Sequence, residues 1–414
     1  MLIESSEATY HQTIDNYHTG RHLENARKQA EQRGLDDVLI IDVDCHHYET
    51  DNLLPIIERI EDPALRQSAL NMYKYRGASA VLIDQPGYQD GGGRIARYLG
   101  RKVENIPNAP GVQRDLQQAY RWMDALSVDY ACLFPTPMLF LGLHPQVEIE
   151  VNMAKAYNSW MVEEVLAGNS RLRSMLYLPF NDPEATYEMV KKYAGTKGVI
   201  GFMVVSTRYR PIYHNDYMKT YALLEEAGLP ISFHASYSWS DPLTSMTNRF
   251  ITAHAVGFTF FNAVHCANWV INGLPERFPK LKVIWIESGL AWIPWLMQRL
   301  DHDFRMRTSE CPSLRRLPSE YMREMFYTSQ PMEMVNNREA LELTFKMINA
   351  ESQLLYSSDY PHWDMDLPSV IWDLPFLSDH ARRQILGGNA KKLFNIDTSD
   401  RFPASTENVA VATR

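Results

Sequence analysis

Three apolar runs in this chain each end in side chains that bind divalent metals. The first covers residues 38–44, ends in Asp44 and is followed closely by His46. The second, residues 229–233, precedes His234, and the third, residues 353–358, precedes Asp359. Aliphatic runs of this length are typical of buried parallel strands. Because a barrel enzyme builds its site just beyond the ends of its strands, the pattern predicts a divalent-metal site.

The first run carries two candidate ligands on one side. Strand alternation places Asp42, Asp44 and His46 on a common face. A carboxylate and an imidazole two residues apart suit zinc or a similar ion. His234 alone would be interpreted as a core histidine, and Asp359 alone as a helix cap. Their combination favours a metal centre, where Asp359 could also take a proton from metal-activated water.

Eight strand-like segments alternate with helical patterns along the chain. We expect strands at residues 38–44, 130–134, 172–178, 199–205, 230–233, 281–286, 325–328 and 353–358. The clearest helical patterns lie at residues 147–166, 183–193, 216–228, 250–272, 338–348 and 379–393. This alternation predicts a (β/α)8 TIM-like barrel. A doubly wound sheet is the less favoured alternative, because no glycine-rich phosphate turn follows any strand.

The segments outside this alternation define the expected domain organisation. We expect one domain over residues 1–414, with the barrel at residues 38–397 and a helix at residues 5–34 before it. Residues 61–110 interrupt the pattern after the first strand and include the glycine-rich turn segment 84–93. We interpret residues 61–110 as an inserted cap, and both a binding loop and a disordered surface insertion fit it.

Composition excludes several classes of partner. The formal net charge is −9 and no Lys/Arg run is present, which argues against nucleic-acid and membrane-surface partners. Four cysteines without a CxxC pair indicate a reduced, intracellular protein. We see no signal-peptide pattern and expect no stretch apolar enough to span a bilayer. The sequence therefore predicts a cytoplasmic protein.

Longer motifs add a family resemblance. The pieces that carry it are Asp44-Cys45-His46, Phe233-His234-Ala235, Ser358-Asp359-Tyr360-Pro361-His362, the block at residues 276–289, and the glycine-containing block at residues 387–394. Together they resemble the amidohydrolase superfamily, in the branch of aminocarboxymuconate-semialdehyde decarboxylase and the aromatic-acid decarboxylases. The resemblance spans about residues 38–394, and the block at 276–289 is its most specific part. It implies that Asp44, His46, His234 and Asp359 hold one divalent metal, with zinc expected first and manganese as the alternative.

One position departs from this branch. Its decarboxylases commonly end the sixth strand in a His near the metal, whereas this chain has Glu287. Glu287 is therefore a candidate acid–base or substrate-binding carboxylate, or a structural one. His254, on the preceding helical segment, is the other candidate proton donor beside Asp359. Arg208 and His362 follow predicted strands and are candidates for binding substrate, although Arg208 is equally typical of a surface charge.

These residues leave three functions open. Non-oxidative decarboxylation of a small aromatic or unsaturated carboxylic acid comes first, because the resembling branch is dominated by it. Metal-dependent hydrolysis of a C–N or C–C bond is the alternative that Glu287 favours. A catalytically silent binding barrel is the third. We also expect a homodimer, with the helix at 5–34 or the Trp-containing helix after the sixth strand in its interface.

Overall fold

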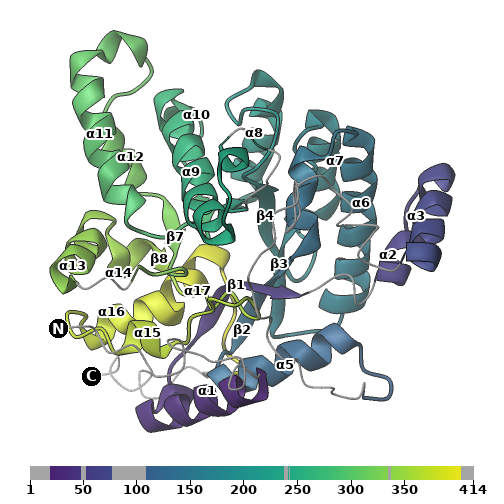
Figure 1. Ribbon diagram of the computed structural model, residues 1–414. Coiled ribbons are helices and arrows are strands. Elements are labelled where there is room, and N and C mark those ends of the chain that lie inside the picture. The colour runs from purple at the N-terminus through teal and green to yellow at the C-terminus, as the bar shows by residue number, and fades with distance from the viewer. Residues whose placement is uncertain are drawn as a thin grey trace, which may run out of the picture.

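The computed structural model describes residues 19–47, 53–76, 109–236, 241, 243–333 and 337–401. In this part of the chain, eight parallel strands follow one another in chain order around a barrel, with helices outside (Figure 1). The strands are β1 (Ile41–His47), β2 (Tyr130–Pro135), β3 (Leu172–Tyr177), β4 (Val199–Val205), β5 (Ile231–His234), β6 (Val283–Ile286), β7 (Phe326–Thr328) and β8 (Leu354–Leu355). The (β/α)8 prediction is confirmed.

The helices between the strands form the outer ring. They are α1 (Thr19–Arg33), α2 (Leu53–Glu58), α3 (Pro63–Arg76), α5 (Arg114–Leu126), α6 (Val147–Trp160), α7 (Pro183–Tyr193), α8 (Met218–Ala227), α9 (Phe250–Ile271), α10 (Leu274–Arg277), α11 (Trp292–Met306), α12 (Pro318–Met322), α13 (Arg338–Met347), α14 (Ala350–Gln353), α15 (Ser369–Trp372), α16 (Asp379–Arg383) and α17 (Asn389–Phe394). A π-helical turn, Gln384–Gly388, joins the last two, so the final helix predicted at 379–393 is continuous but wider at its centre.

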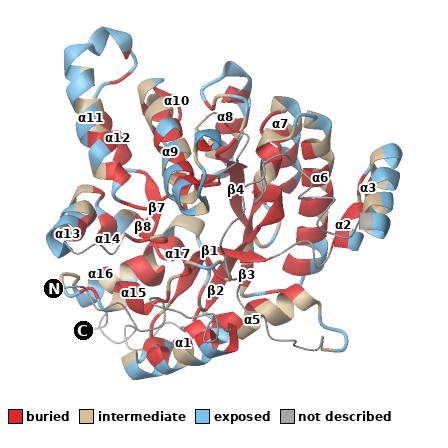
Figure 2. Ribbon diagram, in the orientation of Figure 1, coloured by how far each residue is buried: buried red, intermediate tan, exposed pale blue. Residues whose placement is uncertain are grey.

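The core lies inside and around this barrel. Nearly every strand residue is buried, and the helices bury only the face toward the strands (Figure 2). Continuous burial explains why the strands appear in the sequence as unbroken apolar runs rather than alternating ones. The largest fully buried side chains include Trp122, Trp160, Trp269 and Trp285.

The barrel closes between β1 and the residues that follow β8. The Val43 N–H donates to the Tyr356 carbonyl at 3.0 Å, and the Asp359 N–H donates to the Asp44 carbonyl at 2.8 Å. The ladder of β8 therefore ends at Leu355, although the sequence predicted a strand to residue 358. This closure brings the third metal-binding motif beside the first.

β1 lies three residues further along the chain than predicted. It runs from Ile41 to His47, so that Asp44 and His46 lie within it, and its register against β2 shifts between Asp42 and Cys45. The Asp42 carboxylate turns to the neighbouring backbone, where it accepts from the Ser358 N–H at 3.0 Å. Asp42 therefore supports the loop after β8, and burial raises its pKa to about 8.

The two additions to the barrel are described only in part. α1 packs on the barrel through Leu23, Ala26 and Ala30, and residues 5–18 of the predicted helix lie outside the described residues. Of the predicted cap at 61–110, the structure describes α3 and the last two residues, whereas the glycine-rich segment 84–93 lies outside them.

α9 corrects one expectation from composition. Among the described helices, this 22-residue helix is long and apolar enough to cross a membrane. The expectation that no such stretch exists was wrong. α9 is the barrel helix after β5, and it buries Ala253, Phe258, Cys266 and Trp269 against its neighbours. Long apolar helices of this kind also occur in protein cores, so length and composition here carry no membrane assignment.

Candidate metal centre

Side chains from β1, β5 and the loop after β8 converge at the carboxyl end of the barrel. The Nε2 atoms of His46 and His234 each lie 3.3 Å from Asp44 Oδ1. Asp359 Oδ1 lies 3.5 Å from His46 Nε2. All four side chains are completely buried. The structure thus brings together the four residues that the sequence predicted as metal ligands.

The inward-facing atoms of this cluster have no hydrogen-bond partner among the described residues. They are Asp44 Oδ1 and Oδ2, His46 Nε2, His234 Nε2 and Asp359 Oδ2; Glu287 Oε2, beside His234, is likewise without a partner among these residues. Buried polar atoms without partners are costly, and buried carboxylates especially so. Two imidazole nitrogens and several carboxylate oxygens within reach of one another are a donor set for a divalent cation. The residues therefore fit the metal that the family resemblance implies.

The outer edges of both imidazoles face backbone carbonyls. His46 Nδ1 lies 3.0 Å from the Pro135 carbonyl, and His234 Nδ1 lies 2.8 Å from the Ala235 carbonyl. Each Nδ1 can only donate to its carbonyl, which leaves the Nε2 lone pairs directed at the cluster. A ligand histidine requires this tautomer.

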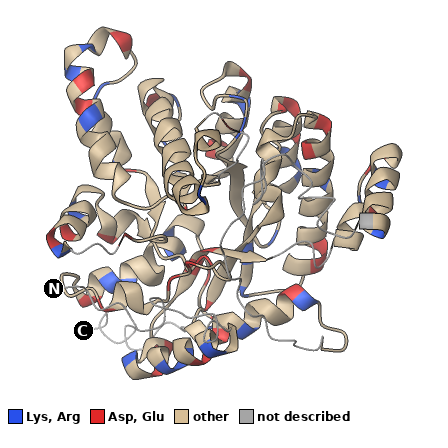
Figure 3. Cartoon of the chain, viewed as in Figure 1, with Lys and Arg blue, Asp and Glu red and all other residues tan. Residues whose placement is uncertain are grey.

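The electrostatics of the cluster also favour a cation. Burial opposes ionisation of Asp44, but His234 and His46 outweigh it and hold the pKa of Asp44 below its usual range. Burial lowers the pKa of His46 to about 4, so this ring is neutral at pH 7. Burial, together with nearby carboxylates, raises the pKa of Asp359. Figure 3 shows most charged positions on the outer helices and an acidic group near β1 at the barrel centre.

Glu287 borders this cluster from the end of β6. Its Oε2 lies 3.5 Å from His234 Nδ1, and its carboxylate belongs to the group of potential ligand atoms formed with Asp44, His46 and His234. Burial, and then the neighbouring Asp359 and Asp44, raise the pKa of Glu287. The structure therefore places Glu287 at the centre and not in a peripheral loop.

His362 contacts the cluster directly. Its Nδ1 lies 2.6 Å from Asp359 Oδ1, and its ring centre lies 4.3 Å from that of His46. Because the opposite ring nitrogen lies 3.3 Å from Thr136 Oγ1, His362 is held between β2 and the loop after β8. It can orient Asp359 or meet a bound substrate.

His254 lies in an aromatic group beside the centre. Its ring stacks on Phe258 at 4.2 Å between ring centres and meets Trp363 edge-on. Its Nε2 lies 3.8 Å from Asp364 Oδ2. Asp364 in turn raises the pKa of both Glu287 and Asp359, which places this carboxylate near the metal centre. The sequence reasoning missed Asp364, and its only signal was its position five residues after Asp359.

Among the described residues, Arg208 makes no hydrogen bond or ion pair with the metal-binding cluster. Its Nε and Nη2 both donate to the Arg210 carbonyl at 2.9 Å, and its guanidinium lies 3.9 Å from the centre of the Phe180 ring. Its Nη1 is buried without a hydrogen-bond partner in the described structure. Arg208 thus remains a predicted substrate-binding residue, with one free donor and no contact with the metal ligands among the described residues.

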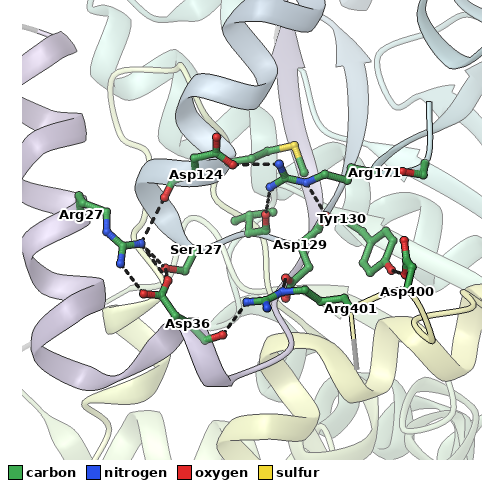
Figure 4. Close-up of a pocket in the computed structure, with 12 residues that line it drawn as sticks. Arg27, Asp36, Asp124, Ser127, Asp129, Tyr130, Arg171, Asp400 and Arg401 are labelled. Carbon is green, nitrogen blue, oxygen red and sulfur yellow. Dashed lines mark hydrogen bonds and ion pairs between the residues drawn. The ribbon is translucent and has the colours of Figure 1, made fainter. Parts of the chain in front are cut away.

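A separate polar pocket of about 560 Å³ lies at the amino ends of β1, β2 and β3 (Figure 4). Its arginines are already paired: Arg27 with Asp36, Arg171 with Asp124 and Arg401 with Asp129. In barrel enzymes the amino ends of the strands serve stability and the carboxyl ends serve catalysis. We therefore assign this pocket to anchoring α1 and the segment after α17.

Comparisons with known proteins agree with this geometry. The sequence model of the family described as amidohydrolase matches residues 42–396. A gamma-resorcylate decarboxylase from Polaromonas is 26% identical over 259 residues, which cover 59% of this chain and 76% of the relative. A second one, from Rhizobium sp. (strain MTP-10005), is 23% identical over 262 residues, covering 60% of this chain and 77% of the relative.

Solved structures share the fold. 5-Carboxyvanillate decarboxylase from Sphingomonas paucimobilis superposes with a TM-score of 0.61 at 21% identity, covering 87% of this chain and all of the relative. A dihydroxybenzoic acid decarboxylase from Polaromonas, with bound manganese and 2-nitroresorcinol, gives 0.60 at 19% identity, covering 88% of this chain and 99% of the relative.

Proposed function

Because the chain belongs to the amidohydrolase family, we propose that it is a metal-dependent carboxy-lyase, which removes the carboxylate of a small aromatic or unsaturated acid without oxidation. The observation that carries this proposal is the convergence of Asp44, His46, His234 and Asp359, whose inward atoms have no other partner among the described residues. The decarboxylases similar to this chain support the reaction type.

Asp44, His46, His234 and Asp359 would hold the metal. A bound divalent cation supplies positive charge that attracts an anionic substrate and stabilises negative charge as the reaction proceeds. Zinc and manganese both suit a mixed imidazole and carboxylate donor set. Three similar solved structures hold manganese, which supports manganese beside our first expectation of zinc. Metal analysis of protein purified without added metal discriminates between them.

The residues around the metal would handle the proton. In decarboxylation the C–C bond to the carboxylate breaks, carbon dioxide leaves, and the electron pair stays on the ring carbon until that carbon takes a proton. Asp359 is suited to carry it, because its carboxylate lies at the centre and His362 Nδ1 orients it at 2.6 Å. His254, beside Asp364, is the second candidate donor.

The test is turnover of two named acids. Metal-loaded protein is incubated with 2,6-dihydroxybenzoate and with 5-carboxyvanillate, and carbon dioxide release is measured with and without a chelator. We expect chelator-sensitive release from at least one acid, and loss of that release in Asp359→Asn. Metal-loaded protein that releases no carbon dioxide from these acids or from a panel of other hydroxybenzoates would contradict the lyase assignment.

Metal-dependent hydrolysis of a C–N or C–C bond is the second candidate. One observation favours it: Glu287 occupies the strand end where decarboxylases of the resembling branch commonly have a histidine, and a buried carboxylate is a suitable general base. Hydrolysis of amide, lactone or ring-cleavage substrates by protein that is inactive on hydroxybenzoates would support this alternative.

We also propose a cytoplasmic homodimer. All four cysteines are free and buried, which supports a reducing compartment. α9 contains no Asp, Glu, Lys or Arg, and it exposes Val256, Phe260 and Val264 along one side and Ile251 near its start. α9 packs beside α11, which exposes Trp295. An uncharged apolar face of this kind favours association with a second copy.

A further inference from the structure

We propose that Glu287 is a positioning residue of the metal centre: it holds the ring of His234 in the orientation in which His234 binds metal. This role is compatible with decarboxylation and with hydrolysis. It rests on the proposed function in one respect only, namely that the centre binds a divalent cation. It differs from an acid–base role, because Glu287 then acts through His234 and touches no substrate.

The His234 ring lies between two carboxylates. Its Nδ1 edge lies 3.5 Å from Glu287 Oε2, and its Nε2 edge lies 3.3 Å from Asp44 Oδ1. All three side chains are almost completely buried. A carboxylate on the far edge of a metal-binding histidine fixes the ring and makes the metal-facing nitrogen a stronger donor. The Nδ1–H donates to the Ala235 carbonyl at 2.8 Å, and this hydrogen bond fixes the tautomer. Glu287 Oε2 faces the same edge without a hydrogen bond, so its contact with the ring is electrostatic.

The backbone of Glu287 is held in an unusual conformation. Its φ is 56°, in the left-handed region that residues with a Cβ rarely adopt. Its N–H donates to Thr328 Oγ1 at 2.9 Å, which ties the residue to β7. The β5–β6 ladder pairs His234 with Ile286, so Glu287 is the next residue beyond the partner of His234. Unfavourable backbone conformations are usually kept where they serve a function. We therefore take the left-handed conformation of Glu287 as support for a functional contact with His234.

Metal affinity is the direct readout of such a contact. The apoprotein is titrated with Mn²⁺ and with Zn²⁺ against a chromophoric chelator, for the wild type, Glu287→Gln and Glu287→Ala. We expect Glu287→Ala to weaken metal binding by about 10- to 100-fold, the usual effect of losing such a support. Gln keeps the shape of the side chain but not its charge, so the metal affinity of Glu287→Gln should fall between those of the wild type and Glu287→Ala.

Glu150→Gln is the matched control. Glu150 is also a buried glutamate. Its carboxylate accepts hydrogen bonds from the Tyr177 hydroxyl and from Asn181 Nδ2, both at 3.0 Å. Neither donor belongs to the metal centre. We expect its metal affinity to equal that of the wild type. Melting curves confirm folding of each variant, and if Glu287→Ala does not fold, Glu287→Gln carries the comparison.

Visible absorption of the Co²⁺-loaded proteins separates positioning from direct ligation. If Glu287 positions His234, Glu287→Gln keeps the wild-type coordination number. A changed coordination number would make Glu287 a ligand and overturn the proposal, as would unchanged metal affinity in both Glu287 variants. None of these measurements needs a substrate, so absence of decarboxylation would contradict the proposed function and leave this inference standing.

Discussion

His234 is held at both edges of its ring. It ends β5, is completely buried, and meets the Ala235 carbonyl at Nδ1 and Asp44 at Nε2. We expect His234→Ala to bind less than about a tenth of an equivalent of metal, because one of the few protein ligands is lost. Its far-ultraviolet circular dichroism should match the wild type, because the barrel strands remain intact.

The control for His234→Ala is His302→Ala, since His302 lies exposed on α11. Elemental analysis after desalting measures the metal content of both variants. A full equivalent of metal in His234→Ala would contradict the ligand assignment, whereas loss of metal in both variants would point to general damage.

Glu150 makes stability depend on pH at a position remote from the metal ligands. Burial raises its pKa from 4.5 to about 7, so the folded state favours the protonated carboxyl. This group stabilises the fold fully below pH 4.5, and that contribution is lost as pH rises to about 7. The change amounts to about 3 kcal/mol at most, at 1.4 kcal/mol for each pKa unit.

Glu150→Gln should remove this dependence, because its amide does not ionise. Urea unfolding at half-unit steps from pH 4.5 to 7.5 measures it: the unfolding free energy of the wild type should fall relative to that of Glu150→Gln up to pH 7 and then run parallel. Parallel curves over the whole range would contradict a raised pKa at Glu150.

The sequence predicts the members of the site better than their contacts. Asp44, His46, His234 and Asp359 could be proposed because each follows an apolar run, and barrel closure brings such positions together. The contact of Glu287 with His234 depends on a positive φ after β6, and that of Asp364 with His254 on the path of a loop. Neither leaves a pattern in residue type or spacing.

At the scale of elements, a buried amide on α9 helps to fasten this helix to the barrel. Asn262 Nδ2 donates to the Phe233 carbonyl at 3.2 Å and to the Ile286 carbonyl at 3.1 Å. Its Oδ1 accepts from the Ser206 hydroxyl. A single side chain thus joins α9 to the ends of β4, β5 and β6, next to His234.

We expect Asn262→Leu to lower the free energy of unfolding by about 2–4 kcal/mol, because it leaves buried groups without partners. Asn268→Leu is the control on the same helix, since the Asn268 side chain makes no hydrogen bond to the described residues and is only partly buried. Urea unfolding measures both variants, and equal stability of the two would refute the fastening role.

Element positions could be predicted to within a few residues, and the errors have physical causes. The start of β1 was predicted too early because Val38, Leu39 and Ile40 are also apolar. These residues precede Ile41, where the pairing with β2 begins. β8 was predicted too long because its last residues bond to β1 and leave the β7 ladder. Apolar runs record burial, whereas strand limits are set by backbone partners.

For the whole molecule, the alternation of strands and helices was enough to predict the barrel. Strand–helix–strand units connect parallel strands with a right-handed crossover, which leaves few ways to arrange eight of them into a closed barrel. The strands therefore follow the chain order from β1 to β8 around the barrel. The cap could not be predicted in the same way, because the segment at 84–93 has turn residues without periodicity. The exposed apolar side of α9 could not be predicted either, because α9 is apolar all round and only the structure shows which side is buried.

The last prediction concerns assembly through that surface. Wild-type protein at micromolar concentration should show twice the 47.8 kDa chain mass by light scattering. Phe260→Glu on α9 and Trp295→Glu on α11 each place a charge on the exposed apolar face, and burying an unpaired charge in an interface is costly. Each variant should therefore weaken the dimer at least tenfold. Tyr75→Glu is the control, because Tyr75 is an exposed aromatic residue on α3, a helix that lies away from α9 (Figure 1). A monomeric wild type would contradict the dimer, and dimeric Phe260→Glu and Trp295→Glu proteins would exclude this face as its interface.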